Sequence, residues 1–254
     1  YLDEKGSVVE GLSTEGHLSV AVPGTVSGLL LALERYGTLD RKTVLEPAIR
    51  LARDGFAVSL PLARSLRRMA KRFEGNAESR RIFQRDGRFF EEGELFIQPE
   101  LALTLKRIAT NGAPGFYSGP TADLLVSEME RGKGLISHAD LEAYEARVRV
   151  PVEGRYRGHT VISMPPPSSG GTVLIEMLNL LEPLDLAALG HSSSAYVHTL
   201  AGAMKRAFAD RAEYLGDPDF VAVPVSGMTS KIYAKRRWEG FDLDRTQPAT
   251  ELGA

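Results

Sequence analysis

Most of the chain repeats one pattern, in which apolar residues recur every three or four positions and short polar breaks separate the repeats. In residues 26–36 this spacing predicts a helix, and Gly37 is a natural stop directly after it. Asp40 and Ser59 are residue types that cap helices, and each precedes another periodic stretch. We therefore expect three helices at the start of the chain, the third running to about Phe73.

The middle of the chain continues the helical pattern in shorter stretches. We expect helices at 77–84, 99–110 and 120–131, the second of them opening with a proline at its first position. Ser137 and Asp140 stand three residues apart, which is the spacing of a capping box. A further short helix is expected to begin there.

Alternation of apolar and polar residues then replaces the helical spacing. Residues 147–152 and 160–163 flank a glycine-containing turn at 154–158, and together they predict a β-hairpin. Later apolar periods predict helices at 171–182, 193–213 and 229–238. The whole pattern predicts an α+β chain that is mostly α, with about half of its residues helical.

Composition excludes several classes of protein. With 254 residues, 43% of them apolar and 25% charged, the chain has the makeup of an ordinary globular protein with a core. A net charge of −2 gives no reason to expect nucleic acid, and the basic stretch 64–72 lacks interleaved aromatics. We interpret that stretch as a solvated helix face. No apolar run approaches the ~20 residues of a membrane span.

No set of residues has the spacing of a metal or cofactor site. Cysteine is absent, which excludes disulfides, thiolate ligands and a cysteine nucleophile. The 5 histidines show neither H-x-x-x-H nor H-E-x-x-H spacing, and glycine loops for phosphates or dinucleotides are missing. We therefore expect no metal and no cofactor.

The most informative stretch is residues 164–171, Met-Pro-Pro-Pro-Ser-Ser-Gly-Gly. Consecutive prolines remove backbone donors, so the stretch is neither helix interior nor central strand, and a helix is expected directly after it. One interpretation is that Ser168 or Ser169 caps that helix. The other makes Ser168, Ser169, Gly170 and Gly171 a substrate-binding turn whose N–H groups face a pocket or brace a nucleophile. Spacing assigns no base to either serine, so a serine nucleophile is not supported.

A second group of charges lies near the end of the long helix. Asp217 and Asp219 flank a proline and favour a turn in which carboxylates accept backbone N–H groups. Arg206 and Asp210 are i,i+4 neighbours, an arrangement worth about 0.3 kcal/mol on an exposed helix face. A calcium cage needs more oxygen ligands than this turn supplies, so we favour a structural role. Trp238 is expected to anchor the last helix.

Taken in order, these and other short segments resemble the large-subunit portion of γ-glutamyltranspeptidases. Each segment is weakly specific by itself, but their order along nearly the whole chain is specific. The segments are Pro23–Gly28, Tyr36–Thr38, Leu51–Phe56, Asn111–Gly112 with Phe116–Tyr117, Gly134–Ile136 with Asp140–Leu141, Tyr156–Gly158, the 164–171 loop and Tyr214–Phe220.

The resemblance implies an N-terminal-nucleophile hydrolase as the parent protein. This chain would be the large-subunit part of its four-layer αββα fold. In that family a precursor cleaves itself ahead of a threonine, whose new α-amine acts as base for its own hydroxyl. The γ-glutamyl group of glutathione or a related amide passes through a threonine ester to water or an amino acid. Thr246 and Thr250 lack the family's motif around that threonine, so no catalytic residue is assigned to this chain.

The resemblance also implies what the chain requires. We interpret residues 1–254 as a single partial domain truncated at both ends, inactive alone, whose partners are the small subunit and the N-terminal part of the same precursor. Apolar faces of the helices at 26–36 and 171–182 would then lack partners, which favours low stability or a homodimer. The family resemblance implies a periplasmic or secreted location.

Two other functions are compatible with the sequence. One is an amidase of the same superfamily, similar to a cephalosporin acylase or a capsule-polyglutamate depolymerase. The other is a non-catalytic helical binding module. The residues that read the substrate would lie before Tyr1 and after Ala254, so the sequence in hand does not choose among these functions.

Overall fold

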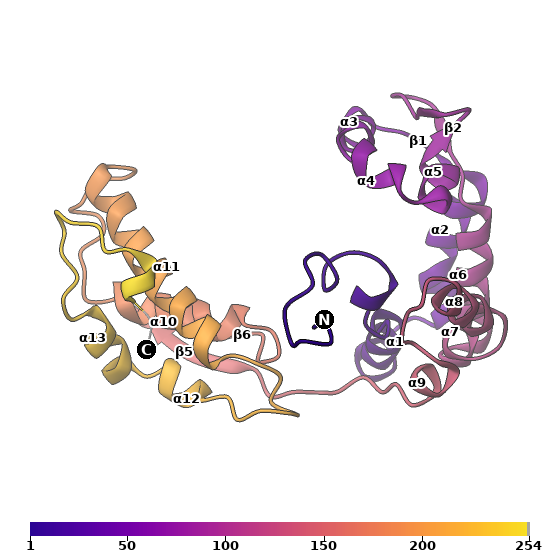
Figure 1. The fold of residues 1–254 in the computed structure, drawn as a ribbon. Helices are drawn as coiled ribbons and strands as arrows, with labels where there is room; N and C mark the ends of the chain where they lie inside the picture. Colours follow the sequence, from indigo (N-terminus) through magenta and orange to yellow (C-terminus); the bar gives the residue numbers. More distant parts are fainter. Residues whose placement is uncertain (253–254) are drawn as a thin grey trace. The chain divides into compact units, whose positions relative to one another are not determined.

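The chain folds into two compact units (Figure 1). A computed structural model describes residues 1–252; unit 1 spans Tyr1–Arg147 and unit 2 begins at Val148. About 53% of the residues are helical, which confirms the predicted mostly α chain. No helix among residues 1–252 combines the length and the apolar character that crossing a membrane requires.

Unit 1 is a series of helices interrupted by two very short ladders. Strand β1 (Phe56–Ala57) pairs with β4 (Leu95–Phe96), and β2 (Gln84–Arg85) pairs with β3 (Arg88–Phe89), both antiparallel. The helical elements are η1 (His17–Ser19), α1 (Thr25–Tyr36), α2 (Arg41–Asp54), α3 (Leu60–Arg68), α4 (Ala70–Glu74), α5 (Ala77–Phe83), α6 (Pro99–Asn111), α7 (Pro114–Tyr117), α8 (Gly119–Arg131) and α9 (His138–Glu142).

The predicted caps in unit 1 are confirmed. Asp40 accepts the amides two and three residues further on, at 2.9 and 3.1 Å, at the start of α2. Ser59 accepts the amide of Leu62 at 3.4 Å at the start of α3. At α9 the capping box is complete, because Ser137 and Asp140 each accept the other's backbone amide. These side chains satisfy amides that have no partner inside their helices.

One predicted helix of unit 1 is wrong in its length. The stretch expected to run from Leu60 to about Phe73 is divided at Met69 into α3 and α4.

The short ladders β1–β4 and β2–β3 were not predicted, because two residues are too few to produce a visible alternation. Phe96 of β4 nevertheless carries much of the packing there: it is buried and contacts Phe90 with ring centroids 5.1 Å apart.

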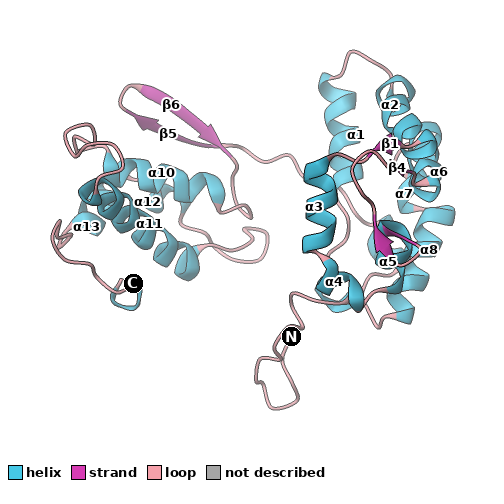
Figure 2. Cartoon of the chain, turned by 90° about the horizontal axis from the view of Figure 1, so that it is seen from above, coloured by secondary structure: helices cyan, strands magenta, loops and turns pink. Residues whose placement is uncertain are grey.

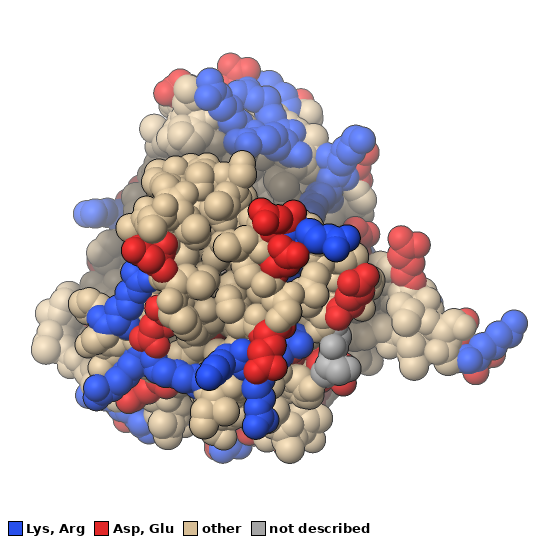
Figure 3. Space-filling view, turned by 90° about the vertical axis from the view of Figure 1, so that its left-hand side faces the viewer, with Lys and Arg blue, Asp and Glu red and all other residues tan. Residues whose placement is uncertain are grey.

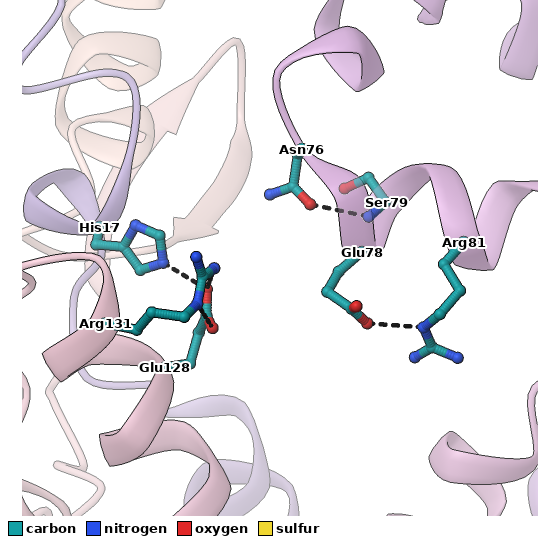
Figure 4. Close-up of polar contacts among 7 residues, drawn as sticks. All are labelled: His17, Asn76, Glu78, Ser79, Arg81, Glu128 and Arg131. Atoms are coloured by element: carbon teal, nitrogen blue, oxygen red, sulfur yellow. Dashed lines mark hydrogen bonds and ion pairs between the residues drawn. The ribbon is translucent and has the colours of Figure 1, made fainter.

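A side-chain contact between His17 and Glu128 fastens the start of the chain to α8 (Figure 4). His17 Nε2 lies 2.6 Å from Glu128 Oε1, and Arg131 donates from Nε to the same carboxylate at 2.8 Å. Arg131, and after it His17, lower the pKa of Glu128 to about 2. Figure 4 also shows the cap of α5, where Asn76 Oδ1 accepts the amide of Ser79 at 2.8 Å.

One buried core of unit 1 gathers around α7, α8 and α9, apart from the cluster that contains Phe90 and Phe96. Tyr117 joins this core to the segment before α1: its hydroxyl donates to the Pro23 carbonyl at 2.6 Å and accepts the Ser27 amide at 3.2 Å. Leu141 is fully excluded from water. The buried members of the cluster are Tyr117, Ala122, Val126, Met129, Ile136 and Leu141.

Unit 2 is a hairpin followed by helices (Figure 2). Its elements are β5 (Val152–Tyr156), β6 (His159–Ser163), α10 (Gly170–Leu181), α11 (Ser194–Tyr214), α12 (Val225–Met228), α13 (Lys231–Trp238) and η2 (Ala249–Glu251). The predicted hairpin is confirmed, but its first strand begins at Val152 and continues into the expected turn as far as Tyr156. Pro151 has no amide to pair, and the turn is made by Arg157 and Gly158, with φ of 48° and 84°.

Helix α10 packs against the hairpin on one side and against α11 and α13 on another. Gly154 of β5 permits the approach, because a Cβ there would lie 2.5 Å from Cγ2 of Ile175. Trp238 stacks on Phe241 with centroids 4.2 Å apart and joins the cluster around Leu180, as expected for an anchor of the last helix.

The two apolar helix faces expected to lack partners differ in the structure. On α1, Leu29 and Tyr36 are 66% and 80% exposed beside an apolar groove of about 560 Å3 between α1, α2 and α6. On α10 most apolar side chains are buried, so the expectation for residues 171–182 was wrong. The hairpin and α13 cover that helix.

We predict that the α7–α9 core contributes strongly to the stability of unit 1. Replacing Leu141 by Ala removes a fully buried side chain and should lower the free energy of unfolding by about 2–5 kcal/mol. Leu135→Ala is the control, since Leu135 is 73% exposed, and its effect should stay within about 0.5 kcal/mol. Urea denaturation of both variants measures the difference; equal effects would contradict the assignment of the core.

Candidate functional site

The loop at 164–171 connects β6 to α10 and closes tightly on itself. The amide of Ser168 donates to the Pro165 carbonyl at 3.1 Å, and the Pro166–Pro167 peptide bond is cis. Gly171 lies against the backbone of Met164, where an added Cβ would stand 2.2 Å from the carbonyl oxygen. The loop therefore needs a residue without a side chain at position 171.

Of the two serines expected as caps of α10, Ser169 does not cap the helix, and that part of the expectation was wrong. Its backbone is helical, with φ −75° and ψ −17°, so it lacks the extended conformation of a capping serine. Arg211 of α11 instead donates from Nε to Ser169 Oγ at 2.9 Å. Ser168 Oγ accepts the Gly170 amide at 3.4 Å, which is a weak contact at the start of the helix. The contact between Ser169 and Arg211 of α11 thus holds the loop more firmly than the weak contact between Ser168 and Gly170.

The acidic turn after α11 forms as predicted. The amide of Asp219 donates to Asp217 Oδ1 at 3.0 Å. Arg149 adds a contact that the sequence did not reveal: its two Nη atoms lie 3.1 and 2.7 Å from the Asp219 carboxylate. The bond to Asp219 raises the pKa of Arg149. This bidentate pair ties the segment before β5 to the turn.

The proline loop and the acidic turn form two walls of one pocket in unit 2. The cavity measures about 350 Å3, and its third wall is the extended segment 148–150. It is mainly apolar, and its one cation is already paired with the acidic turn. The lining residues are Val148, Arg149, Val150, Pro165, Pro166, Pro218, Val223 and Val225.

A buried cluster of titratable side chains includes a residue of α10, the helix that follows the loop. Glu176 of α10 and Asp210 of α11 are 0% and 1% exposed. Asp210 Oδ2 accepts the Tyr233 hydroxyl at 2.8 Å and Arg237 Nε at 3.0 Å, while Arg237 Nη2 lies 2.8 Å from Oδ1. The cluster therefore joins three helices, α10, α11 and α13.

The predicted surface pair of Arg206 with Asp210 was wrong. Arg206 is 2% exposed; it donates from Nε to the Arg237 carbonyl at 2.7 Å and from Nη2 to Gln247 Oε1 at 2.6 Å. Its guanidinium also lies over the ring of Trp238, 5.2 Å from the centroid. Arg206 and Asp210 face the interior, because α13 and the segment after α13 cover this side of α11.

The cluster shifts the titration of its members. Burial, and after it the neighbouring Asp210 carboxyl, raise the pKa of Glu176 well above its usual range. The same two causes raise the pKa of Tyr233. Sequence reasoning missed Glu176, Tyr233 and Arg237. One signal was present: Glu176 is a lone acid within an apolar run and lies one turn after Thr172.

Other site chemistries find less support in the described part of the chain. Among residues 1–252, no group of three or more His, Asp or Glu side chains is placed to hold a metal ion. On the face shown in Figure 3, Lys and Arg side chains lie beside Asp and Glu side chains instead of forming a field of one sign.

Comparison with known proteins connects these features to a family. The family model for gamma-glutamyltranspeptidase matches residues 1–253. The glutathione hydrolase proenzyme of Escherichia coli is 43% identical over 253 residues, which is 99% of this chain and 44% of that protein. The crystal structure of Helicobacter pylori gamma-glutamyltranspeptidase superimposes with a TM-score of 0.94 at 43% identity, covering 99% of this chain and 72% of that one.

These matches place the fold among the N-terminal-nucleophile hydrolases. Within that superfamily, the chain belongs to the γ-glutamyltranspeptidase family. A cephalosporin acylase from Bacillus halodurans is more distant: it has a TM-score of 0.82 at 28% identity and covers 89% of this chain and 43% of that one. The chain spans about 44% of the length of the E. coli relative.

We predict that the two adjacent glycines of the loop respond differently to a methyl group. Gly171→Ala places a Cβ against the Met164 carbonyl and should lower the free energy of unfolding by about 1–3 kcal/mol. Gly170→Ala is the matched control, because its Cβ would meet only Ser168 Oγ at 3.6 Å, and its effect should stay within about 1 kcal/mol. Denaturation of both variants tests this; a larger loss at Gly170 would contradict the loop geometry.

Proposed function

We propose that the chain is a large-subunit segment of a γ-glutamyltranspeptidase that transfers or hydrolyses the γ-glutamyl group of glutathione and related amides. The family match along residues 1–253 carries this proposal. The name of the E. coli relative, glutathione hydrolase proenzyme, supports both the substrate class and a precursor that is processed. The nucleophilic threonine lies outside this chain.

The chemistry proposed for the parent protein is acyl transfer through a threonine ester. The threonine hydroxyl attacks the γ-carbonyl, and the α-amine of the same residue takes the proton. Donors that point at the developing oxyanion stabilise the tetrahedral intermediate. Water or the amine of an amino acid then takes up the γ-glutamyl group. No residue of this chain performs these steps, and the isolated chain is inactive.

The contribution of this chain is the loop at 164–171. Ser168, Ser169, Gly170 and Gly171 are proposed to border the γ-glutamyl site or to brace the nucleophile. Ser168 and Gly170 are exposed at the start of a 12-residue helix, where amides favour a carboxylate or a polarised carbonyl. Arg211 engages the hydroxyl of Ser169, and the hydroxyl of Ser168 meets the Gly170 amide only weakly, at 3.4 Å.

The rest of the precursor is the proposed partner of this segment. We infer that both units belong to one partial domain, residues 1–254, of a four-layer αββα fold completed by the small subunit and the N-terminal part. The length comparison supports missing partners, since the chain covers 44% of the E. coli relative. The exposed apolar groove on α1 supports them as well.

A second candidate is an amidase of the same superfamily that acts on a cephalosporin side chain. The structural similarity to the Bacillus halodurans acylase supports it, at lower identity than the transpeptidases. The substrate separates the two candidates. A full-length precursor that cleaves a cephalosporin amide faster than a γ-glutamyl amide would favour the acylase.

We predict that the full-length precursor cleaves itself and turns over a γ-glutamyl anilide, whereas residues 1–254 alone do neither. Nucleophile and base must act together, and neither is assigned to this chain. Anilide release measured by absorbance tests the first part, and gel electrophoresis tests self-cleavage. Turnover by the isolated chain, abolished by a substitution within it, would overturn the proposal.

We predict that the isolated chain self-associates through the α1 groove, as a homodimer or a larger species. Leu29→Glu should reduce this association, since Leu29 lines the groove and is 66% exposed. Leu124→Glu is the control on α8, because Leu124 is 67% exposed and does not line the groove. Sedimentation velocity measures the outcome. A compact monomer at micromolar concentration would contradict the prediction.

A further inference from the structure

Two adjacent residues of α11 hold the loop and its helix at two separate points. Arg211 donates to Ser169 Oγ at 2.9 Å and so holds the loop itself. Asp210, one residue earlier, faces inward and interacts with the carboxyl of Glu176 on α10. Because Glu176 is six residues after the first residue of α10, it lies roughly 9 Å along the helix from the loop.

The hydrogen-bond donors near Glu176 and Asp210 are directed to only one of the two carboxyl groups. Tyr233 and Arg237 both donate to Asp210. Within residues 1–252, neither oxygen of Glu176 receives a hydrogen bond, although the side chain is fully buried. An ionised carboxylate without donors is strongly disfavoured away from water. A neutral carboxylic acid brings its own O–H donor, and Asp210 Oδ1, which lies 2.8 Å from Arg237 Nη2, has a second lone pair that can accept it.

Among residues 1–252, the other surroundings of Glu176 add no second cation. Asp210 and Arg237 are the charged groups whose field acts on it, and Asp210 already engages Arg237. Arg206 directs its donors to backbone carbonyls and to Gln247. Strand β5 meets α10 through Gly154, and α12 contains no titratable residue. One positive charge thus faces two carboxyl groups, which favours one shared negative charge.

We propose that Glu176 is a neutral carboxylic acid that shares its proton with Asp210, and that it acts as a positioning residue for Ser168–Gly171. The positioning role rests on the proposed γ-glutamyl function. The hydrogen bond fixes the rotation of α10, and Arg211 fixes Ser169, so the first amides of the helix keep one direction. No bond other than this hydrogen bond forms or breaks.

The proposal determines the sign of a pH effect. The ordinary pKa of a glutamate is 4.5, and in the folded protein burial and Asp210 raise the pKa of Glu176 above it. The folded state therefore keeps a proton that the unfolded chain loses. The contribution is complete below pH 4.5 and is lost as the pH rises toward the folded pKa. Ionisation then sets two negative charges against one arginine and loosens α10.

The test compares variants in the full-length precursor. Glu176→Gln keeps a neutral hydrogen-bond donor of the same shape, Glu176→Leu removes it, and Glu213→Gln is a matched control at an exposed site of α11. At neutral pH, KM for a γ-glutamyl anilide should stay within about twofold in Glu176→Gln and rise about fivefold or more in Glu176→Leu. The fall of melting temperature with rising pH should be smaller in Glu176→Gln than in the unmodified protein and unchanged in Glu213→Gln.

Other results would overturn the proposal. If Glu176→Gln raises KM as much as Glu176→Leu, the ionised form is the working one. If its melting temperature keeps the original pH dependence, the proton is not on Glu176. If Glu176→Leu lowers the melting temperature and leaves KM unchanged, the role is structural only. Should Glu176→Leu fail to fold, Ser169→Ala and Arg211→Lys replace it as tests of loop position, and an unchanged KM in both would count against positioning.

The shared proton and the proposed function can be tested separately. A precursor without any γ-glutamyl turnover would overturn the proposed function and, with it, the positioning role of Glu176. In that case, a weaker pH dependence of melting in Glu176→Gln would still support the shared proton.

Discussion

The ion pair between Asp210 and Arg237 is the interaction on which unit 2 depends most. It joins α11 to α13, and the two side chains are only 1% and 18% exposed. Removing one partner of a buried pair leaves the other charge uncompensated, at a cost of about 3–5 kcal/mol. Tyr233 donates to the same carboxylate, and Glu176 packs beside it from α10. The loop 164–171 leads into α10, so the buried groups that hold α10 in place also fix the position of the loop, although they lie more than one helical turn away from it.

Unit 1 is stabilised in a different way, by local caps and by apolar contact. Asp40 and Ser137 satisfy the first amides of their own helices, and Tyr117 joins the core to the segment before α1. Among the residues that the structure describes, nothing comparable covers the groove beside Leu29, where apolar surface remains in water. Burying such surface contributes about 25 cal/mol per Å2, so the groove is where unit 1 has most to gain from a partner.

The sequence predicts well what is local and poorly what is long-range. The cap at Asp40, the turn at Asp217 and the hairpin could be found because the residues that make them are neighbours in the chain. Arg211 with Ser169, and Arg149 with Asp219, bring together residues far apart in sequence, and no periodicity encodes those pairs. The capping role expected of Ser169 failed because its backbone is already helical, and the distant Arg211 donates to its hydroxyl instead.

A single guanidinium near the end of α13 donates to two separate acceptors. Arg237 pairs with Asp210 and also donates from Nη2 to the Leu252 carbonyl at 2.7 Å. A planar fork with five N–H donors can do both at once, whereas a lysine ammonium is a single point of charge on a flexible stem. Replacement by lysine would preserve the charge and force a choice between the buried Asp210 carboxylate and the Leu252 carbonyl. At this position the shape of the cation is what the fold selects, and its charge alone would not suffice.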